Sequence, residues 1–459
     1  MTRHSGDVRS GARTNSGGSV LFTDLYELTM AQAYAAEGME NIAVFELFFR
    51  ELPATRNYVL ACGLEGVLSF LEEFQFTSTD LEYLKSLNRF SHDFLERLKR
   101  LRFTGNVYAV PEGTVVFPLE PVVQVVAPII EAQLVETWIL NQIHCQSVFA
   151  SKAARMVTAA ADRAVIDFGA RRSHGIDAAL KVARASYIAG FAATSNMEAG
   201  RCYGIPVSGT MAHSYIQAHE QESDAFRHFM QVFPGTTLLV DTYDTLVAVK
   251  SVIHLVKTSG GRLKVGAVRL DSGDLNDLSQ QARRLLDKAG MTQVEIIVSG
   301  GLNEGRIAAL VQAQVPVNGF GVGTNLAVSR DAPELDFAYK LVEYARQPRI
   351  KTSSSKMILP GRKQVFRRWR NGCMVDDVIV RVDEQMDGEA LLVPVMQGGR
   401  RLLAGHDSLE DMRARARQQL RALPPPIRRL ERAESRYPAE ISALLLADQI
   451  ALRSKLEAG

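Results

Sequence analysis

The sequence predicts an α/β protein: an irregular parallel βα barrel plus a mixed α/β domain formed by the segments on either side of it. Three observations support this fold class. The 459 residues exceed the usual size of a single hydrophobic core. Short apolar segments alternate with helical patterns between residues 136 and 335, as in repeated βα units. Outside that range, strand and helix patterns mix without such a repeat.

The first 135 residues are expected to form a polar tail and an N-terminal α/β domain. Residues 1–20 lack an apolar core and predict a disordered tail rather than a signal peptide. The domain, residues 21–135, is predicted from hydrophobic periodicity and Pro-punctuated apolar runs. Its elements are a helix at 21–37, a strand at 42–50, helices at 64–74 and 93–101, and short β segments from 111 to 130. A long apolar helix is expected from residue 135 to about 160.

The catalytic barrel is predicted over residues 136–335. Seven β segments support it: 164–171, 187–195, 206–213, 237–242, 264–271, 295–299 and 317–323. Most gaps between them carry a helical pattern, which indicates a parallel sheet closed as a barrel, with an open sheet as the alternative. Since only seven segments are present, a regular eight-stranded barrel is not expected. Residues 336–459, β-rich and then helical, are expected to pack on the N-terminal domain.

Composition excludes several classes of function. Lys and Arg number 53 against 51 Asp and Glu, so the net charge of +2 does not indicate nucleic acid or membrane as the main partner. Four cysteines without metal-ligand or disulfide spacing indicate a reducing compartment. No apolar run approaches the roughly 20 residues of a membrane-spanning helix, so a cytoplasmic location is expected.

The residues at the predicted strand ends carry the chemistry, because the loops of a βα barrel meet at that face. They are Arg171, Arg172, Ser195, Asn196, Thr210, His213, Asp241, Asp244, Arg269, Asp271, Asp274, Gly300, Gly301, Gly321, Gly323 and Thr324. Cations, carboxylates, one histidine and glycine turns together predict a polyanionic substrate, a divalent metal and a group that becomes protonated or covalently modified.

Two glycine turns are candidate phosphate sites. Gly300-Gly301 and the segment 319–324 each follow a predicted strand and precede a helical pattern, so backbone N–H groups could cradle a phosphate. Either turn alone could be purely structural. Their occurrence in two consecutive units, the last before the barrel would close, favours the phosphate site common in such barrels.

Two acidic strand ends suggest a metal site. Arg269 and Asp271 point to one face of a strand, although a structural ion pair would explain the same spacing. Asp241 supplies a second carboxylate, and Asp241 with Asp271 could hold Mg²⁺ beside a phosphate. His213 ends a predicted strand, and spacing alone leaves open whether it is catalytic or a hydrogen-bonded structural residue.

From residue 21 onward the chain resembles the nicotinate phosphoribosyltransferases. The matching motifs, in the order of that family, are TDLYELTM (23–30), FFRELP (48–53), FGARR (168–172), GTMAH (209–213), VDTYD (240–244), RLDSGD (269–274) and GVGT (321–324). The downstream segments KTSSSK (351–356) and PGRKQ (360–364) resemble the family as well. One departure is Ser173-His174-Gly175, where the family pattern has Ala-Gln-Gly.

The resemblance implies a role for each matching residue. His213 would be phosphorylated by ATP and would act in catalysis with Arg269 and Asp271. The substrate-binding set would be Tyr26, Arg171, Ser195, Thr210 and Arg269, and the phosphate-binding set Gly300, Gly301, Gly321, Gly323 and Thr324. Asp241 and Asp271 would bind Mg²⁺ or Mn²⁺. The resemblance also implies a type II phosphoribosyltransferase barrel and a homodimer with shared active sites, in which Tyr26 approaches the barrel of the neighbouring subunit.

The implied activity is the ATP-coupled synthesis of nicotinate mononucleotide and pyrophosphate from nicotinate and phosphoribosyl pyrophosphate, the first step of NAD salvage from nicotinate. One alternative is nicotinamide phosphoribosyltransferase, which holds its neutral amide with an aspartate. The corresponding position here is Ser195, where no carboxylate would repel nicotinate. The other alternative is a phosphate-binding barrel without catalytic activity.

Overall fold

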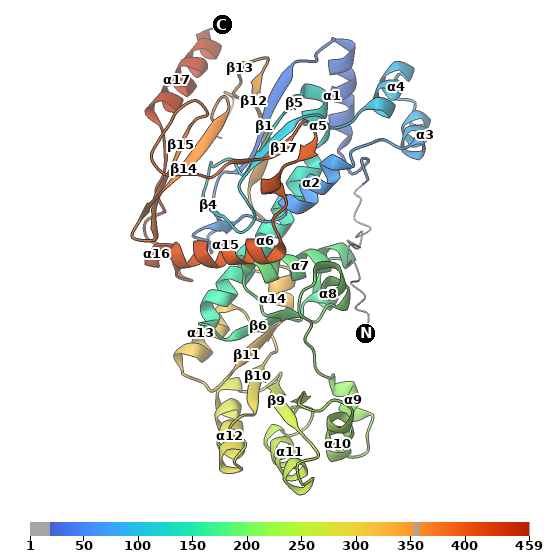
Figure 1. Ribbon diagram of the computed structural model, residues 1–459, viewed down its shortest axis with the longest axis vertical. Coiled ribbons are helices and arrows are strands. Elements are labelled where there is room, and N and C mark those ends of the chain that lie inside the picture. Colours follow the sequence, from blue (N-terminus) through green and yellow to red (C-terminus); the bar gives the residue numbers. More distant parts are fainter. Residues whose placement is uncertain (1–18, 353–357, 459) are drawn as a thin grey trace, which may run out of the picture.

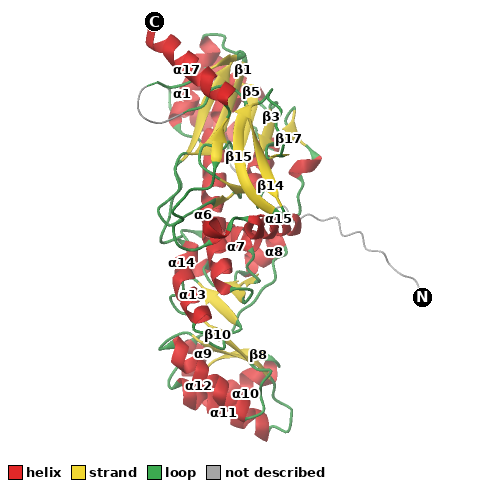
Figure 2. Cartoon of the chain, turned by 90° about the vertical axis from the view of Figure 1, so that its left-hand side faces the viewer, coloured by secondary structure: helices red, strands yellow, loops and turns green. Residues whose placement is uncertain are grey.

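The computed structural model describes residues 19–352 and 358–458. The molecule is elongated, with sheets and helices of the N- and C-terminal segments at one end and a parallel sheet at the other (Figures 1 and 2). The long helix α6 (Glu136–Ala160) lies between the two regions. Most of the predicted disordered tail, residues 1–18, and residues 353–356 of the motif at 351–356 lie outside the described residues.

The N- and C-terminal segments share one seven-stranded sheet, in the order β13-β12-β1-β5-β3-β17-β18. Its strands are β1 (Ile42–Phe49), β3 (Asn106–Ala109), β5 (Val123–Pro128), β12 (Phe337–Tyr344), β13 (Gln347–Pro348), β17 (Val393–Gln397) and β18 (Arg400–Arg401). In the centre, β1 pairs antiparallel with both β5 and β12. Every β1 residue after Ile42 is buried, which explains why its sequence is apolar without alternation.

Helices from the N-terminal segment accompany this sheet: α1 (Leu25–Ala36), α2 (Leu64–Glu72), α3 (Ser78–Ser86), α4 (His92–Arg100) and α5 (Ile129–Leu134). A two-stranded sheet of β2 (Val59–Leu60) and β4 (Val115–Val116) lies beside α6 and α15. The helix α3 and the strand β3 have no counterpart in the sequence prediction.

The C-terminal segment also forms a four-stranded sheet, in the order β16-β14-β15-β19. Its strands are β14 (Lys363–Arg370), β15 (Cys373–Arg381), β16 (Glu389–Ala390) and β19 (Ala439–Ile441), and its helices are α15 (Leu409–Ala422), α16 (Pro425–Arg428) and α17 (Ala443–Ala458). Arg413 of α15 donates to the carbonyls of Tyr187, Gly190 and Phe191 at the end of α7. This cation stabilises the negative end of that helix and ties the C-terminal segment to the barrel.

The barrel region is built on six parallel strands in the order β7-β6-β11-β10-β9-β8. They are β6 (Ala164–Asp167), β7 (Ala193–Thr194), β8 (Thr236–Leu239), β9 (Val265–Leu270), β10 (Glu295–Val298) and β11 (Gly319–Val322). The connecting helices are α7 (Ile176–Ala189), α8 (Met197–Tyr203), α9 (His213–Gln217), α10 (Glu222–Val232), α11 (Thr245–Thr258), α12 (Leu275–Lys288), α13 (Glu304–Gln312) and α14 (Thr324–Ala327).

The predicted α/β fold with an irregular barrel is confirmed, and the barrel is incomplete. Within residues 19–352 and 358–458, the edge strands β7 and β8 are not paired with each other, and the sheet extends past β7 only by an isolated parallel bridge between Thr194 and Val207. The result is a curled half-barrel.

Among all the residues that the structure describes, no helix is long and apolar enough to cross a membrane.

Two of the seven predicted barrel strands are wrong over most of their length. Residues 187–189 end helix α7, and only Ala193–Thr194 of the predicted strand 187–195 is extended. The run looked like a strand because the second half of α7 is buried on all sides, so it lacks the polar face that marks a surface helix. Of the predicted strand 206–213, only Val207 forms a bridge, and His213 begins helix α9 instead of ending a strand.

Candidate active site

A cavity of about 580 Å³ opens at the C-terminal ends of the barrel strands. Of the residues predicted from the strand ends and the family motifs, Tyr26, Asn196, Asp241, Asp244 and Asp274 do not line it. The lining residues include Phe168, Arg171, Arg172, Ser195, Thr210, His213, Arg269, Asp271, Ser299, Gly300, Gly301, Gly321, Gly323 and Thr324. Residues from positions 168 to 324 therefore meet in one pocket, as the strand-end argument requires.

Arg269 is the central cation of the pocket. Its Nη1 donates to Thr210 Oγ1 across 2.6 Å, and its guanidinium carbon lies 5.7 Å from the centre of the Phe168 ring. The side chain is only 13% exposed, and Nε has no hydrogen-bond partner among the described residues. Burial lowers the pKa of Arg269, while Asp271 and Asp241 oppose that shift. A partly desolvated, oriented guanidinium of this kind is suited to binding a carboxylate.

Asp271 and Asp241 are the two carboxylates next to this cation: Asp271 lies near Arg269, and Asp241 accepts a hydrogen bond from the Asp271 backbone. Asp241 Oδ2 accepts from the Asp271 backbone N–H at 3.1 Å and from Ser272 Oγ at 2.5 Å, whereas its Oδ1 is buried without a partner in the described part of the chain. Asp271 Oδ1 accepts from Ser299 Oγ at 2.5 Å and lies 3.8 Å from Arg269 Nη2.

These carboxylates fit a divalent cation that is completed by substrate oxygens and water. The unpartnered Asp241 oxygen and the half-exposed Asp271 supply hard oxygen ligands, which Mg²⁺ prefers. Residues 19–352 and 358–458 contain no group of three or more His, Cys, Asp and Glu side chains that could hold a metal by themselves. Any metal here therefore depends on the substrate for its remaining ligands.

His213 lies at the rim of the same cavity, at the first residue of α9. Its Nδ1 is 3.1 Å from Thr242 Oγ1, in the turn after β8. This contact orients the ring and leaves Nε2 without a hydrogen-bond partner among the described residues. The imidazole is thus held in place by one nitrogen, as a positioned acceptor of a proton or phosphoryl group would be.

Close approach of the backbone explains the glycines in both candidate phosphate loops. Gly300 has a φ of +86°, and a Cβ there would lie 1.8 Å from the carbonyl oxygen of Asp271. A Cβ on Gly321 would lie 2.4 Å from Phe168 Cε2. Asn325 Nδ2 donates to the carbonyls of Gly301 at 3.2 Å and Leu302 at 2.9 Å, which joins the two loops.

Asp167 is a site residue that the sequence reasoning missed. It is 1% exposed, and its carboxylate accepts from Gly169 N–H and from Thr194 Oγ1, both at 2.7 Å. Burial raises its pKa, and these two hydrogen bonds oppose the shift. It fixes the turn that carries Arg171 and the strand end before Ser195. An acidic residue at the end of an apolar β segment was the available signal.

The family departure at Ser173-His174 lies beside the main cavity. Ser173 lines an adjoining hollow of about 410 Å³ with Ile176 and Asn196. Its hydroxyl donates to the Gly169 carbonyl at 3.3 Å, within the same turn. The departure therefore changes the flank of the arginine turn and leaves the strand-end residues in place.

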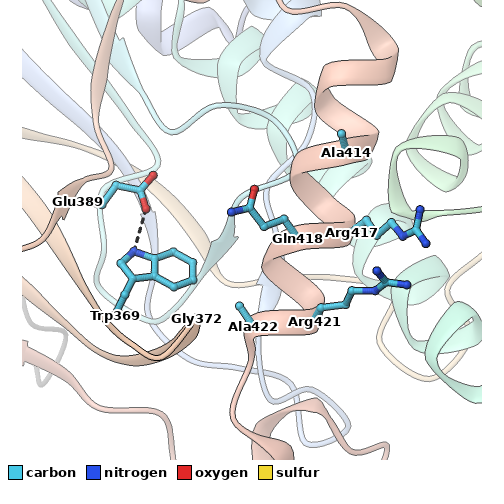
Figure 3. Close-up of a pocket in the computed structure, with 8 residues that line it drawn as sticks. All are labelled: Trp369, Gly372, Glu389, Ala414, Arg417, Gln418, Arg421 and Ala422. Carbon is cyan, nitrogen blue, oxygen red and sulfur yellow. Dashed lines mark hydrogen bonds between the residues drawn. The ribbon is translucent and has the colours of Figure 1, made fainter.

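A larger hollow, of about 840 Å³, lies between α15 and the β14–β15 hairpin, and its polar groups do not converge (Figure 3). Trp369 Nε1 donates to Glu389 on one side of it. Arg417 and Arg421 point away from that pair, on the other side of α15. These arginines are exposed helix-face residues, so size alone does not mark the functional site.

Tyr26 does not line the cavity of its own chain. It lies in the first turn of α1, a helix in the region of the seven-stranded sheet rather than in the half-barrel (Figure 1). Its side chain is 46% exposed, and its neighbours Phe22 and Leu25 are each 45% exposed.

Known proteins resemble this chain over most of its length. The sequence profile of the nicotinate phosphoribosyltransferase (NAPRTase) N-terminal domain matches residues 21–144, and that of the NAPRTase family matches residues 164–355. Nicotinate phosphoribosyltransferase pncB2 of Mycobacterium tuberculosis is 57% identical over 433 residues, 94% of each chain. The Bacillus subtilis nicotinate phosphoribosyltransferase is 42% identical, over 81% of this chain and 78% of that one. The crystal structure of human nicotinic acid phosphoribosyltransferase superimposes with a TM-score of 0.83 at 29% identity, covering 94% of this chain and 99% of that one.

Proposed function

The chain belongs to the nicotinate phosphoribosyltransferase family, and we infer from this premise that it transfers the phosphoribosyl group of phosphoribosyl pyrophosphate to nicotinate. The products are nicotinate mononucleotide and pyrophosphate, so the enzyme serves NAD biosynthesis. One observation carries the assignment to this cavity: Arg269 with Thr210, the Asp241–Asp271 pair and two glycine loops meet at the ends of parallel strands.

The arrangement suits displacement at C1 of the ribose. As the bond to pyrophosphate breaks, positive charge develops on the sugar ring while the pyridine nitrogen attacks. Arg269 and Thr210 bind the nicotinate carboxylate and thereby orient the ring nitrogen, while the loops at Gly300-Gly301 and Gly321–Thr324 hold the sugar phosphate. Ser195 lines the cavity without a negative charge, which favours nicotinate over nicotinamide.

Asp241 and Asp271 would hold Mg²⁺ or Mn²⁺. When bound, the metal would neutralise the pyrophosphate leaving group. The buried, unpartnered Oδ1 of Asp241 supports this role, since a buried carboxylate oxygen without a donor is costly unless a ligand satisfies it.

His213 would couple ATP to the reaction. A ring nitrogen attacks the γ-phosphorus of ATP, ADP leaves, and water later releases inorganic phosphate from the phosphoramidate. The nitrogen must be unprotonated when it attacks. The contact between Nδ1 and Thr242 supports this proposal, because it fixes the ring at the rim of the cavity.

The active enzyme would be a cytoplasmic homodimer. Tyr26 does not line the cavity of its own chain, and it is exposed beside Phe22 and Leu25. A second copy that covers these apolar side chains would bring Tyr26 to the neighbouring cavity, which would make each site a composite of two chains.

Turnover tests the proposal directly. Purified protein, phosphoribosyl pyrophosphate and Mg²⁺ are incubated with nicotinate or with nicotinamide, with and without ATP, and the mononucleotide is measured by chromatography. We expect product from nicotinate, formed faster with ATP, and no ATP stimulation in His213→Ala, whose folding is checked by circular dichroism. Preference for nicotinamide would support the amide enzyme, and no product with either base would support a non-catalytic barrel. Stimulation that survives in His213→Ala would refute the phosphohistidine.

A further inference from the structure

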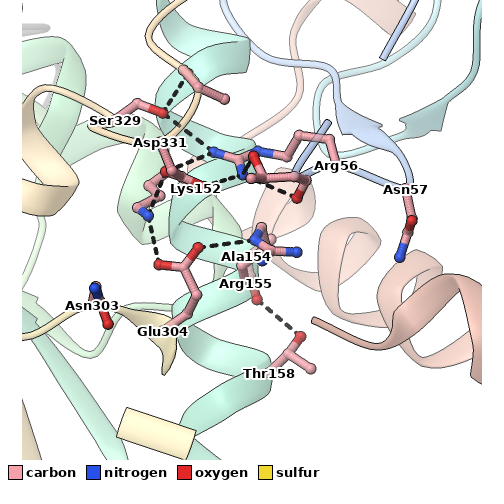
Figure 4. Close-up of polar contacts among 12 residues, drawn as sticks. Arg56, Asn57, Lys152, Ala154, Arg155, Thr158, Asn303, Glu304, Ser329 and Asp331 are labelled. Atoms are coloured by element: carbon pink, nitrogen blue, oxygen red, sulfur yellow. Dashed lines mark hydrogen bonds and ion pairs between the residues drawn. The ribbon is translucent and has the colours of Figure 1, made fainter. Parts of the chain in front are cut away.

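Five charged side chains form a network around a buried lysine that joins four separate segments (Figure 4). At its centre Lys152, on α6, is 2% exposed. Its Nζ lies 2.5 Å from Glu304 Oε2, in the first turn of α13, and 2.6 Å from Asp331 Oδ1, in the turn after α14. One ammonium group therefore bridges two carboxylates that come from different helical units.

Two arginines complete the network. Arg155 Nε donates to Glu304 Oε1 at 3.0 Å, and Arg56 Nη1 donates to Asp331 Oδ2 at 2.6 Å. Burial opposes ionisation of Asp331, but Arg56 and Lys152 hold its pKa well below the usual range. Each carboxylate thus contacts two cations, and Lys152 is the cation that both share.

The two carboxylates lie directly downstream of the two glycine loops. Glu304 follows Gly301 by three positions, and Asp331 lies just beyond α14, which begins at Thr324. Near the first residues of α13 and α14, Asn325 Nδ2 donates to the Gly301 and Leu302 carbonyls. The two loops are consequently linked twice, once by the hydrogen bonds of Asn325 and once by the ion pairs of the buried Lys152.

We propose that Lys152 is a positioning residue that sets the separation of the two glycine loops and thereby the affinity for the phosphate of the phosphoribosyl substrate. The proposal rests on the assigned function of these loops. A cradle of backbone N–H groups binds a phosphate well only at a fixed geometry. Without Lys152 no group bridges Glu304 and Asp331, and the two carboxylates repel each other, so the start of α13 and the turn after α14 are no longer held at a fixed separation.

The test substitutes Lys152→Met and compares the KM values of both substrates. We expect the KM for phosphoribosyl pyrophosphate to rise about tenfold and that for nicotinate to change by less than about twofold. Lys363→Met is the matched control, because Lys363 is also buried, at 3% exposure, and pairs with Glu46 at 2.7 Å in the other region of the molecule. It should lose stability without a selective change in either KM.

A double variant separates positioning from stability. Lys152→Met/Glu304→Gln removes the repulsion between the two carboxylates, leaves Asp331 paired with Arg56, and leaves Arg155 an amide oxygen in place of the Glu304 carboxylate. Its Tm should be higher than that of Lys152→Met, while the KM for phosphoribosyl pyrophosphate stays high, because the Lys152 bridge is still missing. If that KM returns to the native value together with Tm, if both KM values rise equally, or if Lys363→Met shows the same selective rise, Lys152 is only a stabilising residue.

Calorimetric titration with Mg²⁺ and phosphoribosyl pyrophosphate, without nicotinate, keeps this test independent of turnover. Binding that is about tenfold weaker in Lys152→Met supports the inference even if the native protein makes no mononucleotide, a result that would refute only the proposed activity. If the native protein is active and Lys152→Met binds phosphoribosyl pyrophosphate as tightly as the native protein does, the inference is refuted and the proposed activity is not.

Discussion

Arg269 donates to the Thr210 hydroxyl across 2.6 Å, so a barrel strand and a loop 59 positions earlier in the chain share one hydrogen bond. The contact holds the guanidinium against Phe168 and fixes the direction of its remaining N–H groups. In the proposed function, specificity for an acid would therefore depend on a cation whose orientation is set before the substrate arrives.

Replacing Arg269 with Lys should weaken nicotinate binding. A lysine ammonium group cannot bind a carboxylate through two parallel N–H groups as a guanidinium does. We therefore expect the KM for nicotinate to rise roughly tenfold or more. Steady-state kinetics at saturating phosphoribosyl pyrophosphate measure this. Arg283→Lys serves as the control, since Arg283 holds the turn at Met291 and Val294 outside the cavity. An unchanged KM in Arg269→Lys would contradict the assigned contact.

A negative charge at position 195 should shift the preference away from the acid. Two like charges about 4 Å apart near a protein surface repel with roughly 4 kcal/mol, part of which relaxation removes, so Ser195→Asp should raise the KM for nicotinate at least about tenfold. Nicotinamide, which is neutral, should be affected far less. The competing substrates are compared in one assay, with Ser195→Asn as the uncharged control. Equal losses in both variants would mean that size rather than charge matters.

Gly300→Ala should abolish the activity, because its Cβ would overlap the Asp271 carbonyl at 1.8 Å in a backbone conformation with φ of +86°. Gly305→Ala, at the second residue of α13, meets only Asn303 Oδ1 at 3.5 Å and should keep full activity with at most about 1 kcal/mol of added stability. Turnover and urea unfolding of both variants check the contrast. An active Gly300→Ala enzyme would remove this loop from the site.

Mixing two variants that each lack the ATP-stimulated activity tests the composite site. Tyr26→Ala and His213→Ala homodimers each lack one contribution in both cavities, whereas a mixed dimer contains one intact cavity. After subunit exchange at equal concentrations, about a quarter of the native ATP-stimulated activity should return. A monomer by light scattering, or no recovery despite proven exchange, would contradict the shared site.

The buried pair of Arg184 and Glu112, with Nη1 and Oε2 2.7 Å apart, makes a pH-dependent contribution to stability. Burial alone would raise the pKa of Glu112, but Arg184 and backbone N–H groups lower it to about 2. Against an ordinary value near 4.5, this corresponds to roughly 3 kcal/mol, fully present above about pH 4.5 and lost as the pH falls through about 2.

The free energy of unfolding of Glu112→Gln should accordingly be lower than that of the native protein at pH 7, and the difference should shrink steadily below about pH 4.5. Urea titrations at several pH values measure it. Glu40→Gln, at an exposed ion pair with Arg97, is the control and should show a difference near zero throughout. A difference that is constant with pH would exclude the Glu112 carboxylate as its source.

Much of the site could be predicted from the sequence because parallel strands deliver their C-terminal ends to one edge. Arg269, Asp271 and the glycines at 300–301 and 321–323 directly follow or end short apolar strands, and all line the cavity. The fold class, the family and the activity follow from the same motifs and are confirmed. The individual roles of these residues stay predictions until the variants are measured.

The errors have a common physical cause. Periodicity cannot separate a buried helix from a buried strand, which is why residues 187–189 of α7 were assigned to a strand. It also cannot show contacts between distant segments, such as Asp167 with Thr194 or Lys152 with Glu304 and Asp331. These depend on tertiary packing, and the spacing of residues along the chain carries no signal for them.

The pairing of β1 with β12 has a consequence for synthesis of the chain. Phe49 of β1 lies opposite Phe337 of β12. Because β1 is translated first and β12 only after the entire barrel, this edge of β1 stays unpaired until the barrel has been translated. In that interval β1 offers an apolar, unpaired edge to other nascent chains. A truncation shortly before Phe337 should therefore yield aggregates rather than a smaller enzyme, since β12, which is translated after the whole barrel, is needed to cover that edge of β1.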